Sequence, residues 1–136
     1  MNFLLDTNAC IALINGDRPS VRNKVERSIH RGDHFFVSSI STCELWYGVF
    51  KSSRNDFNVN RLEAFLSGSV SVLEFDDDDA RAAGSIRAGL EKRGKLIGPY
   101  DMLLAGQALR HQMILITANV SEFSRVKDLQ WQDWAK

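Results

Sequence analysis

The amino-acid sequence predicts an α/β protein with a central parallel sheet of four to five strands and helices on both faces. Short apolar runs alternate along the chain with longer segments in which apolar residues recur about every three to four positions. The short runs are typical of buried strands and the longer segments of amphipathic helices, so the alternation favours strands joined by helical crossovers. No Pro- or Gly-rich linker divides the 136 residues, and we expect a single domain over residues 1–136.

Each strand is predicted where an apolar run falls, beginning with Phe3-Leu4-Leu5. The predicted strands are residues 3–5, 35–37, 70–75 and 113–116. After Phe123 the tail still holds enough apolar residues to pack down or to form one last strand. The sheet therefore has four strands, or five if the tail joins it.

Helices are predicted between these strands, with boundaries set by residues that favour helix starts and stops. Pro19 suits a first helical turn, and Gly16, Gly32, Gly68 and Gly94 lie where helices are expected to end. The predicted helices cover residues 8–14, 19–31, 41–50, 59–66, 76–93 and 101–111.

Composition indicates a soluble globular protein, with 44% hydrophobic and 25% charged residues and no apolar run near the roughly 20 residues of a membrane helix. No secretion signal precedes the first strand, and Cys10 and Cys43 are too few for a disulfide scaffold, so we expect a cytoplasmic protein. The formal net charge is zero. Lys24, Arg27 and Arg31 would share a helix face, which fits phosphate contact and a solvated surface equally well.

Several polar residues follow strand ends, where open parallel sheets bind their ligands. Asp6 follows the first strand, Glu44 lies early in the helix after the second, and Asp101 opens the helix before the fourth. Thr117 and Asn119 follow the fourth strand. Clustered carboxylates repel one another unless a cation balances them, and Mg²⁺ prefers such oxygen ligands. A metal ion held here would activate a water and stabilise charge on a phosphate.

Each acid also has a purely structural interpretation. Asp6 and Asp101 are typical helix caps, and Glu44 is the fourth residue of a capping-box pattern that begins at Ser41. The acidic run 76–79 is the most conspicuous in the chain, but it suits a charged helix N-terminus and we expect a structural role for it.

Four segments spread over almost the whole chain carry a more specific pattern. They are Phe3–Asn8, Ser38–Gly48 with Glu44 inside it, Ile97–Ala108 with Gly98-Pro99-Tyr100-Asp101 inside it, and Leu115–Phe123. Together and in this order they resemble the PIN-domain ribonucleases, and among these the VapC-type toxins of bacterial toxin–antitoxin pairs.

The resemblance implies a PIN-like fold and Mg²⁺- or Mn²⁺-dependent cleavage of RNA, with Asp6, Glu44 and Asp101 as the acidic metal site. It also implies a homodimer and a small cognate VapB-type antitoxin that blocks the site. Many relatives carry a fourth acid where this chain has Asn119, which offers an oxygen without a charge. We count Asn119 among the catalytic residues and expect one firmly held metal ion. Glu122 would contribute to the site through a water molecule.

Neighbouring side chains are assigned supporting roles. Thr7 and Thr117 are candidates to orient the carboxylates, or are ordinary caps beside strand ends. Trp46, Tyr47 and Phe50 follow Glu44, and we expect at least two of them to pack in the core, the alternative being a dimer or antitoxin surface.

Three other functions share parts of this pattern. A phosphotransferase with Asp6 as nucleophile needs a second acid two residues on, where this chain has Asn8. A receiver domain needs further acids near the first strand and a lysine after a later one, and neither is present. A catalytically degenerate PIN domain that only binds RNA or a protein partner stays open, with Asn119 as the one residue in its favour.

Overall fold

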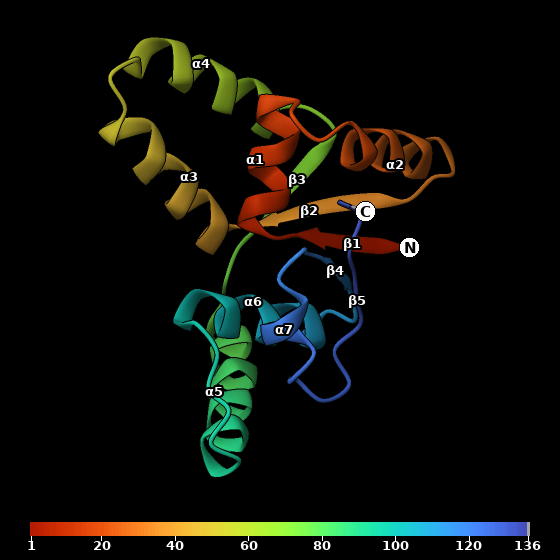
Figure 1. Cartoon of the computed structure of the whole chain (residues 1–136), viewed down its shortest axis with the longest axis vertical. Coiled ribbons are helices and arrows are strands. Elements are labelled where there is room, and N and C mark those ends of the chain that lie inside the picture. The colour runs from red at the N-terminus through yellow and green to blue at the C-terminus, as the bar shows by residue number, and fades with distance from the viewer. Residues whose placement is uncertain (136) are drawn as a thin grey trace.

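Five strands form one sheet among residues 1–135, the part of the chain that this computed structural model describes. Their order across the sheet is β3-β2-β1-β4-β5, and each neighbouring pair is parallel (Figure 1). The strands are β1 (Asn2–Leu5), β2 (His34–Ser38), β3 (Val70–Leu73), β4 (Ile114–Ile116) and β5 (Trp131–Gln132). The predicted fold class is confirmed, and the tail supplies the fifth strand.

Helices cover both faces of this sheet (Figure 1). The first group consists of α1 (Thr7–Asn15), α2 (Pro19–His30), α3 (Ser39–Lys51) and α4 (Asn55–Leu66). The second group, on the opposite face, consists of α5 (Asp77–Lys92), α6 (Pro99–Arg110) and α7 (Val120–Phe123). No helix among residues 1–135 is long and apolar enough to span a bilayer.

The central strand β1 shows why its sequence is almost wholly apolar. Phe3 and Leu5 pack with the first helix group, whereas Leu4 packs with the second group. Successive side chains of a strand point to opposite faces, so a strand covered on both sides buries consecutive residues, here residues 3–5. Residues 3–5 of β1 and all of β4 are buried, and the polar residues Asp6 and Thr117 follow these two strands directly.

Three predicted boundaries were wrong for local reasons, and a fourth was wrong too, because α6 begins at Pro99 rather than Asp101. Helix α3 begins at Ser39 rather than Ser41, because the Ser38 hydroxyl accepts the Ile40 N–H at 3.1 Å and caps the helix earlier. Helix α4 begins four residues before Val59, in an exposed turn that carries no apolar periodicity. Strand β3 ends at Leu73, since the Phe75 N–H donates to Ser39 Oγ at 3.0 Å.

The expectation for the aromatic residues of α3 was also wrong. Trp46 is partly buried against the core, but Tyr47 and Phe50 are 66% and 64% exposed. The helical repeat of α3 places the side chains of Leu45 and Val49 toward the core and that of Tyr47 toward the solvent.

Candidate active site

One cleft brings the three predicted carboxylates together at the carboxyl end of the sheet. The first turns of α1, α3 and α6 gather at this end (Figure 1). Asp6, Glu44 and Asp101 all line the cleft, whose volume is about 680 Å³. Its remaining lining residues are Thr7, Asn8, Ile11, Cys43, Tyr47, Gly48, Lys51 and Tyr100.

Asp6 is the most buried of the three acids, with 5% of its surface exposed. Its backbone N–H donates to the carbonyl of Ile116, and its Oδ1 accepts the Ala9 N–H at 2.7 Å, so Asp6 does cap α1. Burial raises the pKa of Asp6; the Thr117 hydroxyl and the Ala9 N–H oppose this rise, and the charge of Glu44 adds to it. One residue therefore serves as a cap and as a desolvated carboxylate facing other acids.

Glu44 is held by α1 rather than by its own helix. Its Oε1 accepts the Thr7 hydroxyl at 2.6 Å, and that hydroxyl also lies 3.1 Å from Ser41 Oγ. The capping-box interpretation of Ser41 and Glu44 is wrong, because Ser38 is the cap and Glu44 lies in the second turn. Thr7 thus fixes the orientation of Glu44 towards the end of β1.

Asp101 lies inside the first turn of α6, whose cap is Gly98, so Asp101 does not cap this helix. Burial, the hydrogen bond and charge of Glu122, and the charge of Asp6 raise the pKa of Asp101 to about 7. The pKa of Glu122 is lowered, mainly by its hydrogen bond with Asp101. The two carboxyl groups therefore titrate as a pair, in which burial and mutual repulsion favour retention of one proton.

Asn119 joins these two acids through its amide NH₂ group. Its Nδ2 donates to Asp101 Oδ2 at 3.0 Å and to Glu122 Oε2 at 2.7 Å, while Glu122 Oε1 accepts the Gly98 N–H at 3.0 Å. The expected carbonyl oxygen of Asn119 does not face the acids. Glu122 hydrogen-bonds to Asn119 directly, and the i, i+3 spacing of the two residues was the sequence signal for this contact.

The donors in the cleft fit a hard divalent cation. All the side-chain ligands are oxygens, and the neighbouring charges that shift the pKa values of Asp6 and Asp101 are all negative. Within residues 1–135, no three His, Cys, Asp or Glu side chains stand close enough to form a complete ligand set. Mg²⁺ commonly takes only one or two carboxylates and completes its octahedron with waters, so a pair of carboxylates in the cleft would be enough to hold it.

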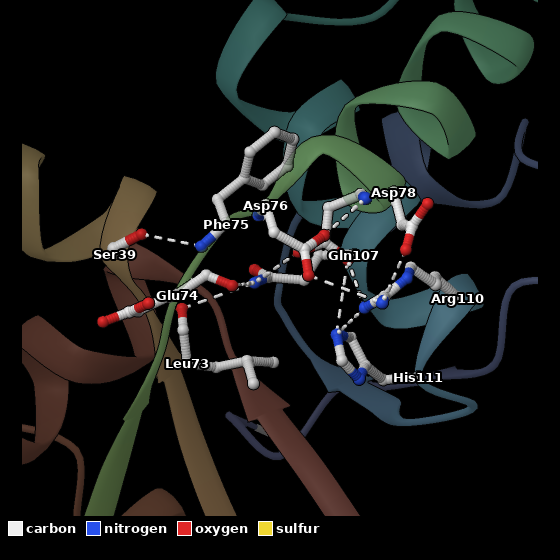
Figure 2. Close-up of polar contacts among 10 residues, drawn as sticks. Ser39, Leu73, Glu74, Phe75, Asp76, Asp78, Gln107, Arg110 and His111 are labelled. Carbon is white, nitrogen blue, oxygen red and sulfur yellow. Dashed lines mark hydrogen bonds and ion pairs between the residues drawn. The ribbon is translucent and has the colours of Figure 1, made fainter.

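The acidic run at the start of α5 lies elsewhere and is structural, as predicted (Figure 2). Asp76 and Asp79 form a capping box, and the fully buried Asp79 carboxylate lies 3.2 Å from Arg110 Nη1 and 3.3 Å from His111 Nε2. Gln107 Nε2 donates to the Leu73 carbonyl at 3.3 Å. This network fastens α6 to α5 and to the end of β3, and so fixes the helix that carries Asp101.

Comparison with known proteins identifies the family. The PIN domain model matches residues 3–129. The tRNA(fMet)-specific endonuclease VapC of Shigella flexneri is 37% identical over 135 residues, and ribonuclease VapC2 of Rickettsia felis is 35% identical over 136; the alignments cover 99% and 100% of both chains.

Solved structures agree with these sequence matches. In the VapBC2 complex of Rickettsia felis bound to a promoter DNA fragment, the matching chain gives a TM-score of 0.91 at 34% identity, covering 98% of this chain and 99% of that one. DNA-bound VapBC of Salmonella typhimurium gives 0.90 at 34% identity, covering 98% of each chain. This chain therefore belongs to the PIN-domain family, among the VapC ribonucleases.

Proposed function

We propose that this protein is a metal-dependent endoribonuclease, the toxin of a type II toxin–antitoxin pair, and that residues 1–136 act as one PIN domain. The observation that carries the proposal is the single cleft in which Asp6, Glu44 and Asp101 meet at the carboxyl ends of the strands. The names of the full-length relatives, endonuclease and ribonuclease, support the same activity.

Asp6 and Asp101 would hold Mg²⁺ or Mn²⁺, and Glu44 would orient the waters of the ion. The ion, when bound, supplies a water of lowered pKa and neutralises charge on the phosphate under attack. Thr7 keeps the Glu44 carboxylate turned into the cleft through its 2.6 Å hydrogen bond. Asn119 holds Asp101 and Glu122 together, and a cation bound by Asp101 would compete with the proton that its raised pKa favours.

The partners follow from the same relatives. RNA is the substrate, and tRNA(fMet) is the first to test because the Shigella relative is named for it. A cognate VapB-type antitoxin would neutralise the enzyme, since the similar chains were solved as VapBC complexes. We further propose a cytoplasmic homodimer, to be tested by light scattering of the purified toxin.

The deciding experiment is cleavage of total RNA and of tRNA(fMet) by the protein freed of antitoxin. Parallel reactions contain Mg²⁺, Mn²⁺ or EDTA, and the control is Asp6→Asn, whose amide oxygen can still cap α1. We expect discrete cuts that need metal and that vanish in the variant. Absence of cutting by the folded, metal-loaded protein would favour a degenerate, binding-only domain. Equal cutting by the variant would show that the site is elsewhere.

A further inference from the structure

One face of α3 runs from the acids to the outer rim of the cleft. Glu44, Tyr47, Gly48 and Lys51 follow one another at spacings of three, one and three residues, so their side chains share this face. All four line the cleft. At a rise of about 1.5 Å per residue, Lys51 lies roughly 10 Å along the helix from Glu44.

Two exposed tyrosines lie beside the acids on different helices. Tyr47 is 66% exposed on α3, and Tyr100 is 50% exposed in the first turn of α6, directly before Asp101. Within residues 1–135 neither ring stacks on another aromatic ring, whereas Trp46 and Phe50 stack on each other at 5.7 Å. Neither tyrosine ring is therefore covered by another aromatic ring of the described residues, and both border the cleft that holds the acids.

The space and the charge around Tyr47 suit a nucleotide. A Cβ added at Gly48 would meet no atom within 4 Å, so the wall beside Tyr47 is open. The Lys51 ammonium lies 5.0 Å from the centroid of the Tyr47 ring and brings a cation to a cleft in which Asp6, Glu44 and Asp101 are acids.

We propose that Tyr47 and Tyr100 are stacking surfaces for unpaired RNA bases flanking the scissile phosphate, and that Lys51 binds a backbone phosphate beside them. Aromatic rings suit this task because every base has a π-face, and stacking is not opposed by the negative charge that repels phosphates from the acids. The inference rests on the proposed ribonuclease function. Under this proposal, two residues other than the three carboxylates give the enzyme its preference for single-stranded RNA.

Binding of a fluorescent single-stranded RNA by the Asp6→Asn protein, with Mg²⁺ present, tests the proposal without cleavage. Tyr47→Ala and Tyr100→Ala should each weaken binding about 5- to 100-fold, whereas Tyr47→Phe and Tyr100→Phe should bind like the parent. Phe57→Ala is the matched control, because Phe57 is 48% exposed on α4 and outside the cleft. Lys51→Gln should reduce the slope of log affinity against log salt concentration by about one, as expected for the loss of one phosphate contact.

In the active protein, the two alanine variants should raise KM for single-stranded RNA more than they lower kcat. Unchanged RNA affinity in both alanine variants would overturn the proposal, while the parent protein still cutting RNA would leave the nuclease function intact. Phenylalanine variants as weak as alanine would also overturn it, since a hydroxyl contact would then replace stacking. Loss of dimer or antitoxin binding by Tyr47→Ala, with RNA affinity unchanged, would make Tyr47 a protein interface instead.

Discussion

Replacement of Gly106 by Ala tests how closely α6, the helix that carries Asp101, packs against α5. Gly106 is buried, and a Cβ built there would lie 2.6 Å from Ala83 N, 2.7 Å from Ala83 Cα and 2.8 Å from Ala83 Cβ. Ordinary van der Waals contact begins at 3.4 Å, so the two helices must separate by roughly 0.6–0.8 Å. The neighbour is mainly backbone, which cannot turn away as a flexible side chain would.

The cost of this change is isolated by a control within α5. Gly84 is exposed, and a Cβ there meets nothing within 4 Å, so Gly84→Ala only gains helix propensity, about 1 kcal/mol. Gly106→Ala has the same gain but adds overpacking of about 1–3 kcal/mol. The free energies of unfolding of the two variants should therefore differ by about 1–3 kcal/mol, or roughly 4–12 °C in Tm for a domain of this size.

Urea unfolding followed by circular dichroism measures this difference. We expect a lower midpoint for Gly106→Ala than for Gly84→Ala, with the same m-value for both, since the surface exposed on unfolding is unchanged. Equal midpoints would refute the close approach of α6 to Ala83. A smaller m-value for Gly106→Ala alone would indicate a looser native state rather than a repacked one.

Further predictions concern the acids and their supports. In EDTA the Tm should fall from pH 5 to pH 8. The pKa of Asp101 is raised to about 7, so the folded protein keeps a proton that the unfolded chain has lost. The resulting stabilisation is full below the usual carboxyl pKa and disappears as the pH passes about 7. Mg²⁺ should reverse the fall, and Asp101→Asn should flatten the profile; a profile that is equally steep in that variant would contradict the assignment. Thr7→Val removes the hydrogen bond to Glu44 and should lower kcat about 10- to 100-fold with little change in Tm, so an unchanged kcat in steady-state cleavage would exclude the orienting role. Asp79→Asn removes the buried charge that faces Arg110 and should destabilise the protein by at least about 2 kcal/mol in urea, yet leave cleavage intact at low temperature; a parental urea midpoint would show that the network is not stabilising.

The positions of the carboxylates could be predicted from the sequence because they depend only on the direction in which the strands run. In a parallel sheet every strand ends at the same edge, so Asp6 after β1 and the helix starts near β2 and β4 must meet there. The capping role of Asp76 could be predicted too, since a charged helix N-terminus needs no information from distant parts of the chain.

Contacts between distant segments could not be predicted in this way. Glu44 matches a local capping box, but the hydroxyl of Thr7, 37 positions away, binds it instead. Whether Asn119 offers its oxygen or its NH₂ group depends on two carboxylates that face it, one of them 18 positions away. The exposure of Tyr47 follows from the rotation of α3 about its axis, which its mixed apolar pattern leaves undetermined.

The most direct test of the account compares Asp101→Asn with Asp77→Asn in metal-dependent RNA cleavage. Both residues are acids in the first turn of a helix, but Asp101 lines the cleft and Asp77 is exposed at the start of α5. Cleavage should be lost in Asp101→Asn and parental in Asp77→Asn, with both proteins folded. Parental cleavage by Asp101→Asn would contradict the claim that the carboxylate cleft is the active site.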